Sequence, residues 1–235
     1  MGIVLQINNK KVKAKAGMTV LQAANQAGIY IPTLCDHPLL EPAGNCRLCM
    51  VEIKGMRGYP TACTTPVNDG MVVKTNTSEL NSLRRNILVL TLSEHPYTCL
   101  VCEKRNNCDD YQKSIRKVGI TTGCQYCPKN GSCELQELVE YLKVDTIEFP
   151  ISYRKLPVEQ DDPFFDRDYN LCVLCGRCVY ICRNYHDQVQ LTFARRGFDT
   201  LISFFGHLES TAPSCDFCRA CVEVCPVAAL LPKSS

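Results

Sequence analysis

Cysteine spacing constrains this chain more than any other feature of its sequence. The 235 residues contain 18 cysteines, and every one of them falls in one of five groups. A cysteine that only fills a core would stand alone at an apolar position of a helix or strand. Intervals of two or three residues are instead the spacing of metal ligands. The groups are Cys35, Cys46, Cys49 and Cys63; Cys99, Cys102 and Cys108; Cys124, Cys127 and Cys133; Cys172, Cys175, Cys178 and Cys182; and Cys215, Cys218, Cys221 and Cys225.

The compartment bears on whether these thiols form disulfides or hold metal. The start of the chain, MGIVLQINNKK, lacks the basic and apolar regions of a secretory signal. The longest strongly apolar stretch, near residues 87–92, is too short to cross a bilayer. We therefore expect a cytoplasmic chain with no transmembrane segment, in which thiols stay reduced and structural disulfides are rare.

The charge balance narrows the class of partner. Lys and Arg sum to 26 and Asp and Glu to 24, which gives a formal net charge of +2. A nucleic-acid-binding surface needs a marked excess of positive charge, so we expect no nucleic-acid partner. Apolar residues make up 46% of the chain, which is enough to bury ordinary cores.

The first segment, residues 1–78, has the pattern of a β-grasp [2Fe–2S] ferredoxin-like domain. Alternating apolar residues predict strands at 3–7 and 11–15, with Asn8-Asn9 as the turn. A helix should follow, opened by a capping-box pair, Thr19 and Gln22, and stopped by Gly28. Further strands are predicted near residues 50–53 and 71–74.

The remaining chain is expected to form two more domains, so that the whole is of the α+β class. Residues 79–155 should be helical and hold a His/Cys cluster site, and residues 156–235 should form a double [4Fe–4S] ferredoxin domain. The apolar face of one helix is expected at Leu80, Leu83, Ile87 and Leu90. That of another is expected at Leu135, Leu138, Val139 and Leu142. A hairpin is predicted around Arg195-Arg196-Gly197.

The strongest chemical signal is a pair of runs near the end of the chain. Both follow the bacterial ferredoxin spacing, in which the fourth cysteine of one run binds the cluster of the other. We therefore assign one [4Fe–4S] cluster to Cys172, Cys175, Cys178 and Cys225. The second [4Fe–4S] cluster takes Cys182, Cys215, Cys218 and Cys221. Zinc is the alternative, but zinc sites favour two CxxC pairs separated by a longer finger.

The first group, Cys35-x10-Cys46-x2-Cys49-x13-Cys63, suits a [2Fe–2S] cluster held by four thiolates. Its gaps are longer than those of plant ferredoxins. Gly44-Asn45, just before the close pair, would let the backbone approach the sulfides. A zinc ion with four thiolate ligands is the alternative.

The middle of the chain carries a histidine beside a cysteine group. His95 is followed by three cysteines in the order His95-x3-Cys99-x2-Cys102-x5-Cys108. We assign these four residues to a [4Fe–4S] cluster with one imidazole and three thiolate ligands, and an incidental His95 is the alternative. The other histidines, His37, His186 and His207, have no ligand pattern and are expected in loops or on the surface.

The order of these motifs resembles a known family. The long-gap group is followed by HPYTCLVCEKRNNC, CQYCPKNGSCELQ, NLCVLCGRCVYIC and CDFCRACVEVCP. This order is similar to the iron–sulfur module of the NADH dehydrogenase large iron–sulfur subunit. Related modules open [FeFe]-hydrogenases and NAD-linked formate dehydrogenases, and one forms the small diaphorase subunit of NAD-reducing hydrogenases.

One departure from that family concerns the middle motif, which in the family usually runs directly into Glu-Leu-Gln. Here the first copy ends at Cys108-Asp109, and a second copy without a leading histidine ends at Cys133-Glu134. The second copy leaves Cys124, Cys127 and Cys133 without a fourth ligand. We expect them to hold a further [4Fe–4S] cluster, whose fourth ligand is a carboxylate, a thiol shared with the first copy, or water. A zinc ion shared between the copies is the alternative.

The resemblance implies an electron-transfer subunit. No dinucleotide-binding Gly-x-Gly-x-x-Gly motif follows a strand and no Walker loop is present, so we expect no catalytic centre of the chain's own. The resemblance implies a flavoprotein partner with FMN or FAD that reacts with NAD(P)H. It also implies a second redox subunit of hydrogenase, formate dehydrogenase or bifurcating transhydrogenase type, with ferredoxin as a further candidate partner.

Two alternatives remain open at this point. A free ferredoxin-like carrier would use the same clusters, although such carriers are usually shorter and strongly acidic, because charge steers transient encounters. A zinc-stabilised scaffold would use the same thiols without redox chemistry. Colour and EPR signals would separate the scaffold from an iron–sulfur protein.

Overall fold

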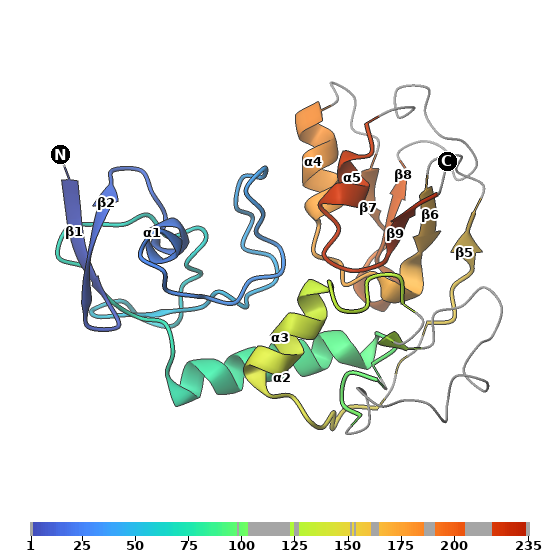
Figure 1. Cartoon of the computed structure of the whole chain (residues 1–235), viewed down its shortest axis with the longest axis horizontal. Helices are drawn as coiled ribbons and strands as arrows, with labels where there is room; N and C mark the ends of the chain where they lie inside the picture. The colour runs from blue at the N-terminus through green and yellow to red at the C-terminus, as the bar shows by residue number, and fades with distance from the viewer. Residues whose placement is uncertain are drawn as a thin grey trace. The chain divides into compact units, whose positions relative to one another are not determined.

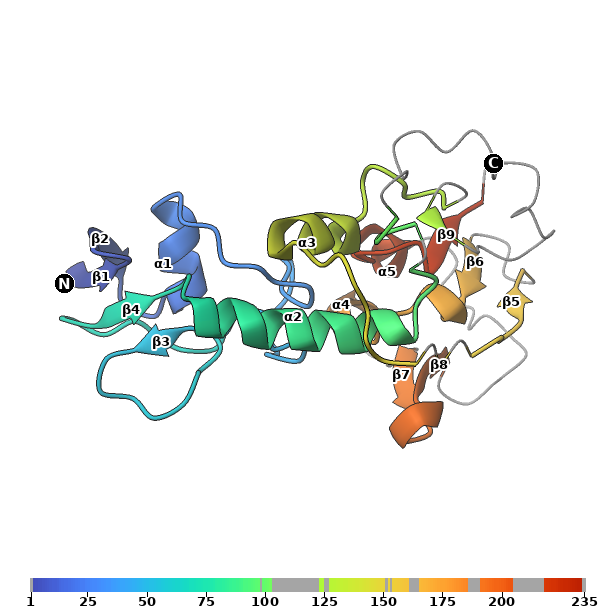
Figure 2. The same cartoon turned by 90° about the horizontal axis from the view of Figure 1, so that it is seen from below.

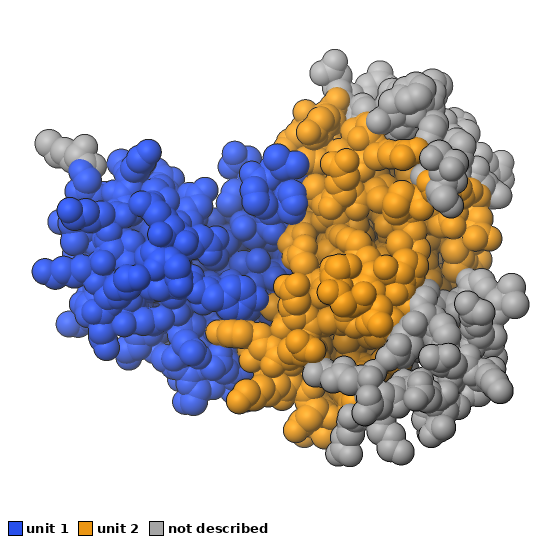
Figure 3. Space-filling model, viewed as in Figure 1, with its two compact units in different colours: residues 1–88 blue, residues 89–235 orange. Residues whose placement is uncertain are grey.

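The computed structural model describes residues 2–97, 99–102, 123–124, 127–150, 152, 154–160, 165–185, 191–204 and 218–233. It divides into two compact units, Met1–Leu88 and Val89–Ser235 (Figure 3). The expected α+β class is confirmed by the mixture of helices and small sheets (Figure 1). The finer division into three domains, with boundaries after residues 78 and 155, stays a prediction.

A four-stranded mixed sheet forms the first unit, in the order β2-β1-β4-β3. β1 (Gly2–Ile7) pairs antiparallel with β2 (Lys10–Lys15) and parallel with β4 (Val72–Lys74). β4 in turn pairs antiparallel with β3 (Glu52–Ile53). All four strands fall within or beside the ranges predicted from the alternation of apolar residues.

Local sequence signals explain the turn and the helix of this unit. Asn8 and Asn9 both have positive φ, 48° and 66°, a conformation that asparagine tolerates and that a tight hairpin turn requires. α1 (Val20–Gln26) begins with the predicted capping box, in which the Gln22 backbone N–H donates to the Thr19 hydroxyl at 3.2 Å. The apolar side of α1 packs with β1 and β2 in one core.

The longest helix of the described residues is α2 (Ser78–Ser93) (Figure 2). Its fully buried line is Leu80, Arg84, Leu88 and Leu92, each 0% exposed. The predicted apolar face was therefore wrong at Leu90, which is 52% exposed. The buried line differs from the predicted apolar face because it includes Arg84, a charged residue that a search for apolar periodicity cannot identify.

The second unit is built on two small antiparallel sheets. One has the order β5 (Val158–Glu159), β6 (Phe165–Asp168) and β9 (Leu230–Pro232). The other is the predicted hairpin, β7 (Leu191–Ala194) with β8 (Leu201–Phe204). The pairing of β6 with β9 matters for function, because β6 leads into the Cys172 run and β9 follows Cys225.

Short helical segments complete this unit. They are α3 (Glu134–Leu142), α4 (Arg177–Tyr185), α5 (Ala220–Glu223) and the 3-10 turns η2 (Tyr169–Leu171) and η3 (Gly197–Asp199). All of them except η3 lie at or beside a cysteine motif. The predicted apolar face of α3 is confirmed, since its four members are at most 2% exposed. No helix in the described part of the chain is long and apolar enough to span a membrane.

Candidate metal centres

The four thiols of the first unit gather as two close pairs. Cys49 and Cys63 are each 1% exposed, and their Sγ atoms are 3.4 Å apart. The Cys46 backbone N–H donates to Cys35 Sγ at 3.4 Å. Electrostatic repulsion acts between Cys63 and both Cys35 and Cys46, so the two pairs are neighbours. The structure thus brings together the four residues expected to hold a [2Fe–2S] cluster.

Each pair has one thiol that gives up its proton readily and one that retains it. The hydrogen bond from Cys35 to Cys46 raises the pKa of Cys35 and lowers that of Cys46 to about 6. The corresponding bond from Cys49 to Cys63 raises the pKa of Cys49 and lowers that of Cys63. Thiolate is the form that binds metal, so an iron–sulfur cluster held by these four residues would displace protons mainly from Cys35 and Cys49.

A buried arginine holds the loop that carries one of these thiols. Arg84 of α2 donates from Nε to the Leu48 carbonyl at 2.9 Å and from Nη2 to the Met50 carbonyl at 2.6 Å. Nη1 donates to the Thr75 carbonyl at 2.9 Å. Leu48 and Met50 flank Cys49, so Arg84 fixes the backbone on both sides of a candidate ligand. Sequence reasoning missed this residue, because an arginine on a helix normally lies in solvent.

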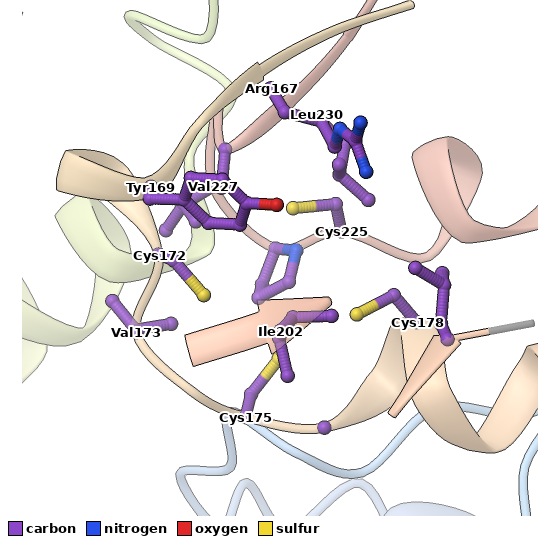
Figure 4. Close-up of a pocket in the computed structure, with 14 residues that line it drawn as sticks. Arg167, Tyr169, Cys172, Val173, Cys175, Cys178, Ile202, Cys225, Val227 and Leu230 are labelled. Carbon is purple, nitrogen blue, oxygen red and sulfur yellow. The ribbon is translucent and has the colours of Figure 1, made fainter. Parts of the chain in front are cut away.

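The first cavity of the second unit, which we call the ferredoxin cavity, is lined by Cys172, Cys175, Cys178 and Cys225. Figure 4 shows the sulfur atoms of these four residues turned toward its middle. Its other walls are mainly apolar and include Val173, Ile202, Val227 and Leu230. These four cysteines are the set that the crossed ferredoxin pattern predicts for one [4Fe–4S] cluster.

Burial favours the protonated form of three of these thiols, Cys172, Cys175 and Cys178, when no metal is bound. It raises the pKa of Cys172 to about 11, that of Cys175 to about 12 and that of Cys178 well above its usual range. At Cys175 a hydrogen bond from the Arg177 backbone N–H and the positive charge of Arg177 both lower the pKa, against the effect of burial. An iron–sulfur cluster would replace these protons and leave thiolates in an apolar shell, which is a common environment for such clusters.

A second cavity, which we call the imidazole cavity, brings together His95, Cys124, Cys127 and Cys133. Cys133 immediately precedes α3, and Cys127 and Cys124 lie in the turns before it. Burial by the surrounding protein raises the pKa of Cys124 to about 12 and also raises those of Cys127 and Cys133. The thiols that the sequence left without a fourth ligand thus share their cavity with an imidazole.

The histidine of this cavity has a buried ring nitrogen that could coordinate a metal. His95 is 9% exposed, and its Nδ1 atom is buried with no hydrogen-bond partner among the described residues. Burial lowers the pKa of His95 to about 4, while a hydrogen bond with the backbone at Leu171 acts in the opposite direction. The imidazole is therefore neutral near pH 7 and retains a lone pair for coordination. An orphaned buried nitrogen beside three thiols fits an iron–sulfur cluster.

The first copy of the middle motif is placed differently. Cys99 and Cys102 are not among the residues that line the imidazole cavity, and Cys108 lies outside the described residues. Cys99 is close to the second copy, because a Cβ added to Gly123 would stand 2.6 Å from Cys99 Sγ. The close approach requires glycine at position 123.

The remaining predicted ligands are partly described. Cys182 is 5% exposed and belongs to an apolar cluster against which Cys178 and Cys221 pack, while Cys218 is half-buried and Cys215 lies outside the described residues. His37 Nδ1 accepts a hydrogen bond from the Leu39 backbone N–H at 3.3 Å, as a loop residue does. His186 and His207 also lie outside the described residues.

The thiols stand around cavities rather than at one point. Within the described ranges, no group of three or more His, Cys, Asp or Glu side chains lies close enough to hold a single metal ion. Thiols spread around a space are the donor set that a multi-iron cluster requires, because each thiolate binds a different part of the cluster.

Two family models match this chain. Residues 2–78 match a 2Fe-2S iron-sulfur cluster binding domain. Residues 162–231 match the ferredoxin-like domain of NADH-quinone oxidoreductase subunit 3. The first match contains all four thiols of the first unit, and the second contains the four cysteines that line the ferredoxin cavity.

Curated relatives match almost the whole chain. An NADH-quinone oxidoreductase subunit of Rhizobium meliloti is 35% identical over 97% of this chain. NADP-reducing hydrogenase subunit HndD of Solidesulfovibrio fructosivorans is 32% identical, again over 97%. The chain spans only 24% and 36% of the lengths of these two relatives.

A solved structure has the same fold. It is an NAD+-reducing [NiFe]-hydrogenase in the H2-reduced state, whose matching chain is 26% identical with a TM-score of 0.77. The match covers 99% of this chain and 88% of the hydrogenase chain. The present chain therefore carries two iron–sulfur domains and resembles, over almost its whole length, subunits of NADH-quinone oxidoreductases and of NAD(P)-reducing hydrogenases.

Proposed function

We propose that this chain is a cytoplasmic electron-transfer subunit of a multisubunit NAD(P)-linked oxidoreductase. It relays single electrons between a flavoprotein subunit with FMN or FAD and a second redox subunit. The second subunit is of the hydrogenase, formate dehydrogenase or transhydrogenase type. The observation that carries the proposal is the ferredoxin cavity, where four thiols from two distant runs of the chain point into one apolar space.

The chemistry of the sites supports electron transfer rather than bond making. A thiolate-held cluster changes its charge by one with little movement of its ligands. Burial, net charge and hydrogen bonds to sulfur set its potential. Each described site supplies buried thiols, and the relatives named above include NAD(P)-linked redox subunits.

The proposed ligand sets keep most of the sequence assignments. A [2Fe–2S] cluster takes Cys35, Cys46, Cys49 and Cys63. One [4Fe–4S] cluster takes Cys172, Cys175, Cys178 and Cys225, and a second takes Cys182, Cys215, Cys218 and Cys221. The proposal for the second [4Fe–4S] cluster rests on sequence spacing, with the packing of Cys182 near Cys221 in support.

The histidine-ligated cluster is regrouped by the imidazole cavity. We infer that His95 joins Cys124, Cys127 and Cys133, in place of the three cysteines that follow it in sequence. Cys99, Cys102 and Cys108 then become the additional site, where a fourth [4Fe–4S] cluster and a zinc ion are the two alternatives.

Metal analysis of anaerobically purified protein tests the cofactor content. The proposal predicts a brown protein with iron and sulfide for one [2Fe–2S] and at least three [4Fe–4S] clusters. A colourless protein that contains zinc and no labile sulfide would contradict it and favour the scaffold.

Native purification tests the role as a subunit. Affinity capture of the chain from its own cells should recover a flavoprotein that oxidises or reduces NAD(P)H. A monomeric chain that holds its clusters but recovers no flavoprotein would instead favour a free ferredoxin-like carrier.

A further inference from the structure

One ion pair joins the segments that carry the two cavities of the second unit. Arg177 Nη1 lies 2.6 Å from Glu134 Oε1, and Arg177 Nη2 lies 2.6 Å from Glu134 Oε2. Glu134 directly follows Cys133 of the imidazole cavity, whereas Arg177 lies between Cys175 and Cys178 of the ferredoxin cavity. The pair is therefore adjacent, along the chain, to ligands of both proposed clusters.

Burial and geometry distinguish this pair from an ordinary surface salt bridge. The Arg177 side chain is 3% exposed and that of Glu134 is 40% exposed. The two parallel contacts make a bidentate arrangement, which fixes orientation as well as distance. Arg177 is the first residue of α4, where a positive charge is unfavourable to the helix dipole. Glu134, the first residue of α3, offsets that cost and is favourably placed for its own helix.

Further hydrogen bonds tie both of these segments to a third one, residues 224–226, which contains Cys225. The Glu134 backbone N–H donates to the Pro226 carbonyl at 3.2 Å, one residue beyond Cys225. Arg177 Nη1 also donates to the Val224 carbonyl at 3.2 Å, and Lys129 Nζ donates to the Cys225 carbonyl. Cys133 and Cys225 are thus linked by a backbone route that contains a single hydrogen bond, from the amide of residue 134 to the carbonyl of residue 226.

We propose that Arg177 and Glu134 are positioning residues that fix the distance and orientation between the two cavities. Their charges also make reduction of a cluster in the ferredoxin cavity more favourable than reduction of a cluster in the imidazole cavity. The inference rests on the proposed function, because it needs clusters in both cavities. The positive end of the pair lies beside the ferredoxin-cavity ligands, and the negative end lies beside Cys133. A cluster becomes more negative on reduction, so the pair favours reduction at the first and disfavours it at the second.

The electron balance of the step is simple. One electron leaves the cluster of the imidazole cavity, which is oxidised by one unit, and enters the cluster of the ferredoxin cavity, which is reduced by one unit. No covalent bond forms or breaks. The flavoprotein partner named under the proposed function supplies the electron.

Opposite shifts of potential in two charge-removing variants test this inference. Redox titration of the cluster-loaded chain, followed by EPR, should show that Glu134→Gln raises the potential of the histidine-ligated cluster. Arg177→Gln should lower the potential of the ferredoxin-cavity cluster. Nitrogen hyperfine coupling identifies the histidine-ligated cluster. Glu137→Gln, an exposed change in the same helix turn, is the matched control and should move neither potential.

A second variant separates the effect of the Arg177 charge from the effect of its bidentate contact with Glu134. Arg177→Lys keeps the charge but cannot make the two parallel contacts. It should leave the ferredoxin-cavity potential near that of the parent and weaken the magnetic interaction between the two reduced clusters. If Arg177→Gln fails to fold, Glu134→Gln and Arg177→Lys still decide the question.

Two outcomes would overturn the inference. One is a Glu134→Gln variant in which both potentials match those of the Glu137→Gln control. The other is a shift of both potentials in the same direction in both charge-removing variants, as general loosening of the structure would produce. A parent chain that holds no iron–sulfur cluster would contradict the proposed function instead, and iron and sulfide analysis separates that case from the other two.

Discussion

At the scale of single residues, buried polar groups define the sites more sharply than the cysteines do. Arg84 is fully buried and donates to three backbone carbonyls, two of which flank Cys49. His95 carries an orphaned nitrogen inside a cavity of thiols. The sequence indicates His95 through its spacing to cysteines, but nothing in the sequence marks Arg84. Its role depends on carbonyls that only the folded loop brings to it.

Replacing Arg84 by Met should destabilise the first unit. Three buried carbonyls would lose their donor, at a cost of roughly 3 kcal/mol or more in the free energy of unfolding. The loss of a buried positive charge should also lower the potential of the [2Fe–2S] cluster. Thermal loss of the cluster's visible circular dichroism and an EPR redox titration measure the two effects. Arg85→Gln, an exposed neighbour, is the control, and an Arg84→Met variant equal to it would contradict the assigned role.

Removing one ferredoxin-cavity ligand should alter one cluster only. Cys178→Ala leaves one iron of its cubane without a thiolate, so that cluster should be lost or converted to a three-iron form. EPR spin counting and iron analysis measure the change. Unchanged iron content and unchanged spectra would show that Cys178 is not a ligand.

At the scale of elements, short sequence motifs correctly predicted those turns, helix ends and helix faces that depend on residues close together in the chain. The Asn8-Asn9 turn, the Thr19–Gln22 capping box and the apolar face of α3 depend on neighbours within a few residues. The face of α2 was mispredicted at Leu90 because a buried arginine lies in the helix's core-facing line. The grouping of His95 with Cys99, Cys102 and Cys108 stays a prediction, and the proposed regrouping differs from it. Proximity along the chain favoured Cys99, whereas the fold places α3 and its preceding turn beside the imidazole.

Matched serine variants of the two motif copies test this regrouping. Cys127 and Cys102 occupy the same place in their copies, and both are half-buried. Cys127→Ser should abolish the EPR signal with nitrogen coupling, because it removes a ligand of the histidine-ligated cluster. Cys102→Ser should leave that signal intact. The reverse pattern would restore the assignment of His95 to Cys99, Cys102 and Cys108.

Replacing the imidazole itself should change a potential without destroying the cluster. In His95→Cys a negative thiolate replaces a neutral ligand, so the cluster becomes more negative and harder to reduce. Its potential should fall and its nitrogen coupling should disappear in the EPR titration. A variant with the parent's potential would show that His95 is not a ligand.

At the scale of the whole molecule, the described cysteines gather at separate places in the two units. In the first unit four thiols lie as two close pairs, and the buried Arg84 binds the backbone beside one of them, Cys49. The second places two thiol-lined cavities on segments joined by the Arg177–Glu134 pair. Cysteine spacing alone predicted a [2Fe–2S] domain and a ferredoxin-like domain, which the two family models support, and the number of clusters stays a prediction. The sequence could not predict the links between sites, because those depend on contacts between residues far apart in the chain.

Whether these thiols hold redox-active iron–sulfur clusters that relay electrons is decided by an EPR-monitored redox titration of the anaerobically purified chain. We predict one [2Fe–2S] signal and at least three [4Fe–4S] signals that appear on stepwise reduction, one of them with nitrogen coupling. A protein with no EPR signal at any potential, and zinc in place of iron, would contradict the proposed role.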